Sequence, residues 1–337
     1  MNAQAKTVEE LGLGWVLFDE FCEEQDILGK SVFLNGFAAR NSDRVETFGS
    51  TAQVGQFNPR IAEYELLERI VVLESGQKPE NAQWKEKSLD GAETGQTLPQ
   101  GLVFPHSDNP SEFSYSKSNG VALHSSWGAA AHGAVFELVE RQSILMSWLG
   151  WTKPVIWKDV DQLQDWLGQT YDIYWAEFDP LSTNIFKSDV ASYGVFLFPK
   201  DKGAPLVYGF GSHLDPAKAK IKAKNEAVQR LGFLWGEEIP QDPPDFSPTP
   251  LFHQDFYLYE KSHDLVLKWL HGDYFEPSAR SHIRLEIQLV DLSLPEMSKE
   301  FCVAKAVCRE AIPLVFGRFG KGPFKNLASS RLIHPIV

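Results

Sequence analysis

Two apolar helices, each carrying a Glu-x-x-Glu-Arg pattern, constrain this chain more than any other feature of its sequence. The first is predicted over residues 59–74 and contains "EYELLERIVVLE"; the second is predicted over residues 134–151, "AVFELVERQSILMSWLGW". Apolar residues recur in the second segment at spacings of three and four, which is typical of a buried helix face. Unpaired ions in such positions cost several kcal/mol each, so these charges require partners. The charged residues are Glu65, Glu68 and Arg69 in the first helix and Glu137, Glu140 and Arg141 in the second.

The spacing of the two glutamates suits the binding of a cation. Glutamates at positions i and i+3 lie on one helix face with their Cβ atoms about 5–6 Å apart. Two such helices facing each other would present four carboxylates and two guanidinium groups. Oxygen ligands without Cys or His favour Mg²⁺ over Zn²⁺, and carboxylate-bound Mg²⁺ usually bridges to phosphates. The alternative is that the pattern marks ordinary solvent-facing ion pairs on surface helices, and the residues alone leave both readings open.

The order of predicted elements indicates an α+β or layered α/β fold with mixed sheets, because helices and strands follow one another without regular alternation. A third long helix is predicted in "DPAKAKIKAKNEAVQRLGFL", where Asp215 is a good N-cap and Pro216 fits the first helical position. The segments between the three long helices are too short for separate domains, so we expect a single domain, residues 1–337. Residues 75–116 and 238–250 are expected to be loops or insertions.

The net charge of the chain limits its partners. It carries a formal charge of −13 at pH 7. A protein this acidic repels nucleic-acid phosphates and anionic membrane surfaces unless basic residues gather locally, so neither is expected as a partner. The first residues are polar and acidic, and no apolar run approaches about 18 residues, which indicates a cytoplasmic protein. The three cysteines show no C-x-x-C spacing, so a structural zinc site is not expected.

Three collinear motifs resemble the hallmark motifs of the YcaO family. The segment "RIAEYELLERI" is similar to S-A-x-x-E-x-x-E-R, and "SNGVALHSSWGAAAHGAVFELVERQ" is similar to the family's second block, S-N-G-x-A-x-G-N-x-x-x-E-A-x-x-x-x-x-x-E-x-x-E-R. The segment "GFGSHLDPAKAKIKAKNEAVQR" resembles a G-x-G-A-H-x-D-P-like turn followed by R-A-x-T-E-x-x-Q. The match extends over about residues 50–235, and the second block looks most like the YcaO subunits of microcin-B17-type azole synthetases.

The resemblance implies a YcaO-type domain in which three long helices line a nucleotide cleft without a P-loop. YcaO proteins bind ATP with Mg²⁺ held by glutamates of the E-x-x-E-R helices, and they phosphorylate a backbone amide oxygen of a peptide. In the best-known members a Cys, Ser or Thr side chain first attacks that amide carbonyl, and loss of the phosphorylated oxygen leaves a thiazoline or oxazoline. On this resemblance Mg²⁺ would be held by Glu65, Glu68, Glu137 and Glu140, and ATP would be bound by Ser125, Arg141, Lys222 and Glu226.

Several positions depart from the family pattern. Ser125 stands where the second block has Asn, and Ala129 stands where it has Glu, a usual metal ligand. Lys222 replaces an Arg of the third helix, which keeps the charge but loses the bidentate fork. The ending "HPIV" contains Pro335 in place of the P-x-P-x-P ending of many azoline-forming members. Beside it, His334 would reach the site if the C-terminal tail folds inward, and it is the one candidate for a catalytic side chain.

These observations lead to one main functional hypothesis and two alternatives. The main hypothesis is an ATP- and Mg²⁺-dependent cyclodehydratase subunit that forms azolines in a ribosomally synthesised precursor peptide. No peptide-recognition or ubiquitin-activating-enzyme-like domain is recognisable, so we expect a partner protein of that kind, and a flavin-dependent dehydrogenase would oxidise azoline to azole. The alternatives are a YcaO enzyme that makes thioamides or amidines, and a non-catalytic scaffold subunit of a peptide-modifying complex.

Overall fold

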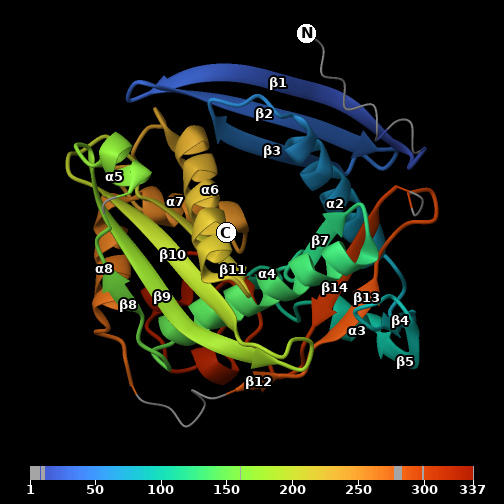
Figure 1. Cartoon of the computed structure of the whole chain (residues 1–337). Coiled ribbons are helices and arrows are strands. Elements are labelled where there is room, and N and C mark those ends of the chain that lie inside the picture. Colours follow the sequence, from blue (N-terminus) through green and yellow to red (C-terminus); the bar gives the residue numbers. More distant parts are fainter. Residues whose placement is uncertain (1–7, 9–11, 160, 277–282, 298–299, 337) are drawn as a thin grey trace. The chain divides into compact units, whose positions relative to one another are not determined.

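The computed structural model describes residues 8, 12–159, 161–276, 283–297 and 300–336 (Figure 1). They form a mixed α/β fold with several antiparallel sheets, as predicted, and the chain divides into two compact units. Neither unit is a continuous stretch of sequence, so the single domain expected above stays a prediction. Unit 1 comprises Met1–Phe104, Lys117–Leu138 and Ile287–Val307, and unit 2 comprises Pro105–Ser116, Val139–Glu286 and Cys308–Val337.

The first sheet of unit 1 is an antiparallel meander covered by a helix. Its strands pair in the order β1-β2-β3, and α2 packs on β3. Gly49 on β3 permits this close contact, because a Cβ atom there would lie 2.2 Å from the carbonyl O of Ala62 on α2. The apolar face of α2, with Leu66 and Ile70, is part of the core of unit 1. The bounds are β1 Trp15–Ile27, β2 Lys30–Asn41, β3 Glu46–Val54 and α2 Arg60–Gly76.

The second sheet of unit 1 brings together distant parts of the chain. Its strand order is β5-β4-β13-β14-β7, and all neighbours are antiparallel. The interior strand β14 is buried along most of its length, whereas β5 at one edge is mostly exposed. The bounds are β4 Gln83–Lys87, β5 Glu93–Pro99, α3 Gln100–Val103, β7 Val121–His124, β13 Gln288–Asp291 and β14 Cys302–Val307.

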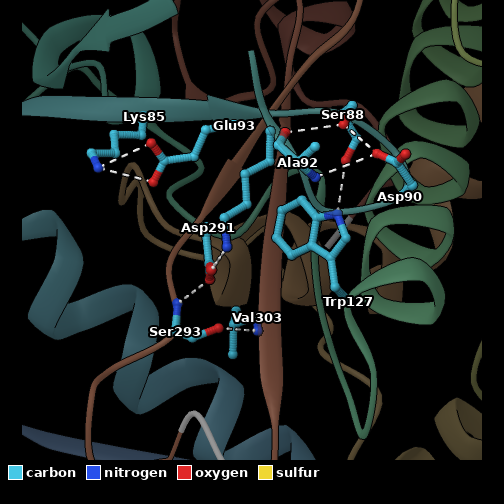
Figure 2. A network of polar contacts seen from close by, with 10 residues as sticks. Lys85, Ser88, Asp90, Ala92, Glu93, Trp127, Asp291, Ser293 and Val303 are labelled. Carbon is cyan, nitrogen blue, oxygen red and sulfur yellow. Dashed lines mark hydrogen bonds and ion pairs between the residues drawn. The ribbon is translucent and has the colours of Figure 1, made fainter. Parts of the chain in front are cut away.

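The polar segment 75–116 contains regular structure, which corrects the expectation of loops. It includes the hairpin β4–β5 and the short helix α3. The sequence did not predict these two strands, because most of their side chains face solvent and show no apolar alternation. Figure 2 shows how the hairpin is held: Trp127 Nε1 donates a hydrogen bond to the carbonyl O of Ser88 at 2.9 Å. Lys87 Nζ also lies 2.6 Å from Asp291 Oδ2 on β13.

The main sheet of unit 2 follows the order β11-β10-β9-β12, with β8 also paired to β9. Helix α6 packs on β11, where Gly209 makes room: a Cβ atom there would lie 2.3 Å from the backbone N of Ala227. As predicted, Asp215 caps α6, and its Oδ1 accepts a hydrogen bond from Ala217 N at 2.9 Å. The bounds are β8 Val155–Trp157, β9 Tyr171–Thr183, β10 Val190–Pro199, β11 Val207–His213, β12 Arg284–Leu285 and α6 Pro216–Leu234.

The remaining elements complete the two units. Helix α4 (Trp127–Trp148) begins in unit 1 and ends in unit 2, and it starts earlier than the segment 134–151 that was predicted. Residues 238–249 contain no helix or strand. Within the described residues, no helix is both long and apolar enough to span a membrane. The other bounds in unit 2 are β6 Phe113–Tyr115, α5 Gln162–Leu167, α7 Pro250–Leu258, α8 His263–His271 and β15 Val315–Gly317, with 3₁₀ turns at Glu260–Ser262, Gly322–Phe324 and Ser329–Leu332.

Candidate functional site

Glu65 links helix α2 to strand β3 of the first sheet. Its Oε1 accepts a hydrogen bond from Arg69 Nη2 at 2.6 Å, one helical turn away. Its Oε2 accepts a second bond from the backbone N of Ser50 on β3, at 2.9 Å. Both oxygens therefore already have partners within unit 1. The role of Glu65 as a Mg²⁺ ligand stays a prediction.

Glu68, one turn further along α2, has a strongly perturbed carboxyl group. Burial raises its pKa from 4.5 to about 8, and the negative charges of Glu137 and Glu65 add to the increase. A hydrogen bond from the backbone N of Leu123 on β7 to Glu68 Oε2, at 2.9 Å, opposes it but does not offset it. The carboxylate form is thus disfavoured by desolvation and by like charges, which is the situation that a bound cation relieves.

Glu137 belongs to the same cluster, although it comes from α4. Its charge acts on Glu68, and the charges of both glutamates act on the ammonium group of Lys305. The structure therefore brings Glu65, Glu68 and Glu137 together, as the motif spacing predicted for the first helix and the start of the second. These three residues and Lys305 all lie in unit 1. We call them the unit 1 charge cluster.

Lys305 on β14 is the member of this cluster that sequence reasoning missed. Its side chain is buried, with the residue only 4% exposed, and Nζ donates hydrogen bonds to the carbonyl oxygens of Lys117 and Asn119, both at 2.8 Å. Burial lowers its pKa from 10.5 to about 8, against the favourable charges of Glu137 and Glu68. The ammonium group thereby holds the turn that contains the S-N-G sequence.

The sequence did contain a signal for Lys305. In "FCVAKAVC" the residues alternate, so Val303, Lys305 and Val307 share one face of the strand. A lysine in the apolar register of a central strand is almost never buried without partners. That register, rather than any known motif, could have marked it as a functional candidate.

Ser125 lies just before α4 and is exposed. Its backbone N donates a hydrogen bond to His124 Nδ1 at 2.9 Å. The first backbone bond of α4 runs from Ala130 N to the carbonyl O of Ser126, at 3.0 Å. Ser125 is therefore next to the N-terminus of a long helix, where anions are favoured. A phosphate contact of Ser125 stays a prediction.

In unit 2, Glu140 and Arg141 occupy the middle of α4. Glu140 is buried, and its Oε1 lies 3.5 Å from Arg141 Nη1. The positive charge of Arg141 also contributes to lowering the pKa of His334, so the C-terminal tail and the Arg of the second motif lie near each other. The inward fold of the tail that the sequence analysis considered is thus present in unit 2.

His334 is nevertheless tied into the fold rather than presented to a substrate. It is fully buried, and its Nε2 donates a hydrogen bond to the carbonyl O of Val315 at 2.7 Å. Burial, and to a lesser extent Arg141, lowers its pKa from 6.5 to about 4, so the imidazole is neutral near pH 7. Next to it, His253 Nδ1 donates to the carbonyl O of His334 at 3.0 Å, and His253 Nε2 accepts from Gly317 N at 3.0 Å. These hydrogen bonds indicate that His253 and His334 have a structural role.

Lys222 and Glu226 lie one turn apart on α6. Glu226 Oε2 accepts a hydrogen bond from the backbone N of Phe210 on β11, at 2.8 Å. Lys222 is exposed, and its Cβ lies above Gly211, where an added Cβ atom would approach it to 2.7 Å. Glu226 thus repeats in unit 2 the attachment that Glu65 makes in unit 1. Nucleotide binding by either residue stays a prediction.

The donor set of the unit 1 charge cluster fits Mg²⁺. Among the residues that the structure describes, no group of three or more His, Cys, Asp and Glu side chains is arranged to hold a metal. Mg²⁺ does not require such a cage, because it usually keeps several waters and is held by one or two carboxylates together with substrate phosphates. Glu68 and Glu137 supply two carboxyl groups whose mutual repulsion a divalent cation would remove.

The family to which this chain belongs follows from its sequence as a whole. Residues 87–304, more than half of the chain, match a family model described as "YcaO cyclodehydratase, ATP-ad Mg2+-binding". The chain belongs to the YcaO family. The matched region contains Glu137, Glu140, Lys222 and Glu226, whereas the first YcaO motif on α2 precedes it. No curated protein matches the chain.

Solved YcaO structures share this fold. The YcaO protein of Methanopyrus kandleri, determined with AMPPCP and Mg²⁺ bound, is 16% identical and has a TM-score of 0.55, with 90% of this chain and 88% of that chain covered. A chain of the E. coli microcin synthetase McbBCD complex is 14% identical, with 86% of this chain and 87% of that chain covered and a TM-score of 0.55 when pro-MccB17 is bound. Without that ligand, the TM-score is 0.53. At these identities the likeness establishes the fold.

Proposed function

We propose that this YcaO protein is the ATP- and Mg²⁺-dependent subunit of a peptide cyclodehydratase. It would phosphorylate backbone amide oxygens and form thiazolines or oxazolines in a ribosomally synthesised precursor peptide. Membership of the YcaO family supports the reaction class, and the similarity to a chain of the microcin synthetase complex is consistent with it. The observation that carries the proposal is the pairing of Glu68 and Glu137, two carboxyl groups close enough that the charge of Glu137 raises the pKa of Glu68.

The residues of unit 1 would prepare the metal site. Glu68 and Glu137 would hold Mg²⁺, which when bound neutralises phosphate charge and orients the transferred phosphoryl group. Glu65 holds α2 against β3 through Ser50 and thereby fixes the position from which Glu68 projects. Lys305 fixes the turn before β7 and adds a positive charge to the cluster. These side chains would orient the substrates and neutralise charge, whereas the new bonds would form between ATP and the peptide.

In unit 2, the positive side chains Lys222 and Arg141 are candidates for binding phosphate. The ammonium group of Lys222, which is exposed, would contact a phosphate, and the guanidinium group of Arg141, beside Glu140, would contact phosphate or orient carboxylates. His334 is assigned no proton transfer, because its pKa of about 4 keeps it neutral and its Nε2–H is bonded to Val315.

The reaction would need other proteins. A precursor peptide is the substrate, and a ubiquitin-activating-enzyme-like or peptide-recognition partner would present it. A flavin-dependent dehydrogenase would follow if the product is an azole rather than an azoline. Loss of one water per modified residue, measured by mass spectrometry, would identify a heterocycle, whereas exchange of oxygen for sulfur would identify a thioamide and overturn the azoline assignment.

Calorimetric titration with Mg²⁺ and AMPPCP tests the site directly. We expect the wild-type protein to bind, and Glu68→Gln to bind at least about tenfold more weakly because one charged ligand is lost. Glu80→Gln, which neutralises an exposed acid just beyond α2, is the matched control and should bind like the wild type. Equal binding by Glu68→Gln would remove Glu68 from the site. No binding by the wild-type protein, alone or with its partner, would overturn the proposed function.

A further inference from the structure

The first sheet of unit 1 and the main sheet of unit 2 are built on the same plan. Each has three antiparallel strands in sequence order followed by a helix on the third strand, β1-β2-β3-α2 and β9-β10-β11-α6. In each, a glutamate on the helix accepts a hydrogen bond from the backbone N–H of the residue that follows a glycine on the third strand. These bonds are Ser50 N to Glu65 Oε2 at 2.9 Å and Phe210 N to Glu226 Oε2 at 2.8 Å.

A second pair of contacts confirms the correspondence. Arg69 lies over the ring of Phe48 at 4.6 Å, and Arg230 lies over the ring of Tyr208 at 4.0 Å. Each ring belongs to the residue just before the strand glycine, and each arginine comes four residues after the helix glutamate. Strand β1 of unit 1 therefore corresponds to strand β9 of unit 2.

The two corresponding strands differ at their outer edge. In unit 2, β8 pairs antiparallel with β9, placing Ile156 opposite Ala176 and Trp157 opposite Trp175, and β12 pairs with the end of the same strand. In unit 1, β1 pairs only with β2 among the residues that the structure describes, so its outer edge has no strand beside it. Within the described parts of the chain, the sheet of unit 1 thus has no counterpart of β8.

Several apolar side chains of β1 are exposed, which fits a strand that binds a further strand at its outer edge. Val16 is 55% exposed, Phe18 43% and Phe21 40%, although the strand lies in a sheet with an apolar core on one side. Phe21 lies over Gly36 of β2, where an added Cβ atom would come within 2.1 Å of its ring. Figure 1 shows β1 as a long strand at the edge of its sheet. Long, exposed edge strands are a known route to pairing with another chain.

The charge on β1 identifies the kind of chain that fits. The strand contains no Lys or Arg, and its acids are all exposed: Asp19, Glu20, Glu23, Glu24 and Asp26. Pairing β1 with β1 of a second copy would bring these carboxylates together across the strands, which is destabilising. The strand that covers the corresponding edge in unit 2 is flanked by lysines, and Lys158 Nζ lies 3.1 Å from Asp172 Oδ1 on β9. The complementary occupant of β1 is basic.

We infer that the outer edge of β1 binds an extended, lysine- or arginine-rich segment of a partner protein as a fourth strand of the sheet. Main-chain hydrogen bonds would supply affinity, and the carboxylates on both faces of β1 would select basic side chains. Apolar residues of the segment would cover Phe18 and Phe21. The inference is independent of the chemistry proposed for the charge cluster.

Hydrogen–deuterium exchange with a synthetic octapeptide of alternating lysine and valine tests this surface. We expect the peptide to protect the amides of β1 and to leave those of α6 unchanged. The charge reversal Glu23→Lys/Glu24→Lys should weaken binding at least about tenfold. The control Glu237→Lys/Glu238→Lys makes the same change of charge at two exposed acids of unit 2 and should bind normally.

Three outcomes would overturn the inference. The first is an absence of β1 protection at saturating peptide, and the second is equal binding by the two charge-reversed proteins. The third is protection of β1 that depends on protein concentration without peptide, because it would mean that a second copy occupies the edge. The neutral pair Glu23→Gln/Glu24→Gln should bind with intermediate affinity, and it replaces the charge reversal if that variant fails to fold.

Discussion

Replacing Glu68 by Gln should stabilise the metal-free protein while weakening its binding of Mg²⁺. The pKa of Glu68 rises from 4.5 to about 8 on folding, so the folded state holds this proton between those pH values and the unfolded state releases it. Each pKa unit corresponds to 1.36 kcal/mol, so ionising Glu68 in the folded protein costs about 5 kcal/mol if the whole shift is realised. Because the residue keeps partial contact with solvent, we expect about 2–3 kcal/mol.

Lys305 shapes the same pH profile in the opposite direction. Its pKa falls from 10.5 to about 8, so its contribution to stability increases as the pH rises through that window. Glu68 removes stability as the pH rises from 4.5 to about 8, so the metal-free protein should be least stable near pH 8. In Glu68→Gln, the decrease in stability between pH 4.5 and about 8 should be absent, whereas the increase in stability that Lys305 causes above about pH 8 should remain.

Urea denaturation between pH 5 and pH 10 in the presence of EDTA measures both effects. At pH 8 we expect Glu68→Gln to exceed the wild type by about 2–3 kcal/mol, with a much smaller difference at pH 5. Glu80→Gln serves as the control, because Glu80 is exposed and is not among the groups that shift the pKa of Glu68, so its neutralisation should give no gain. A flat wild-type profile, or equal stabilities of wild type and Glu68→Gln at pH 8, would refute the reasoning.

Three further predictions follow from contacts described above. Lys305→Met should lower the free energy of unfolding at pH 7 by about 3 kcal/mol, since two buried carbonyl oxygens lose a charged donor; urea titration measures it, and a change below 1 kcal/mol would contradict it. Gly49→Ala should cost at least about 2 kcal/mol, because the new Cβ would meet the backbone of α2, whereas Gly128→Ala, with open space around it, should cost nothing in the same assay. Because folding lowers the pKa of His334 from 6.5 to about 4, stability should decrease by about 3 kcal/mol as the pH falls through that interval, and His334→Gln should show a shallower decrease in thermal melts.

The sequence predicted the long helices. The apolar spacing around the two E-x-x-E-R patterns and the Asp215 cap are local signals; α2 and α6 appear where these signals place them, and α4 contains the second pattern but begins seven residues earlier than predicted. The spacing of Glu65 and Glu68 likewise predicted that they would share a helix face. Such features depend on residues within two turns of each other, which is the range over which a sequence pattern carries structural information.

Features that depend on distant residues were not predictable in this way. The hairpin β4–β5 has no apolar alternation, and its position depends on Trp127 and Asp291, which are remote in sequence. Lys305 meets Glu68 and Glu137 only because β14 pairs with β7. The tail histidine was considered as a catalyst, yet the bonds that bury it come from His253 and Val315. In each case the deciding partner lies more than ten residues away, and no local pattern reports it.

The shared plan of β1-β2-β3-α2 and β9-β10-β11-α6 has a consequence for the origin of this protein. Two copies that agree in strand order, in the position of a glycine, in a glutamate bond and in an arginine over a ring are the expected product of gene duplication and fusion. Aligned on those features, Glu68 of one copy corresponds to Gln229 of the other. At this position, one of many that differ between the copies, a carboxylate stands in one copy and an amide in the other. The carboxylate of Glu68 accepts hydrogen bonds when ionised, whereas the amide of Gln229 both donates and accepts them.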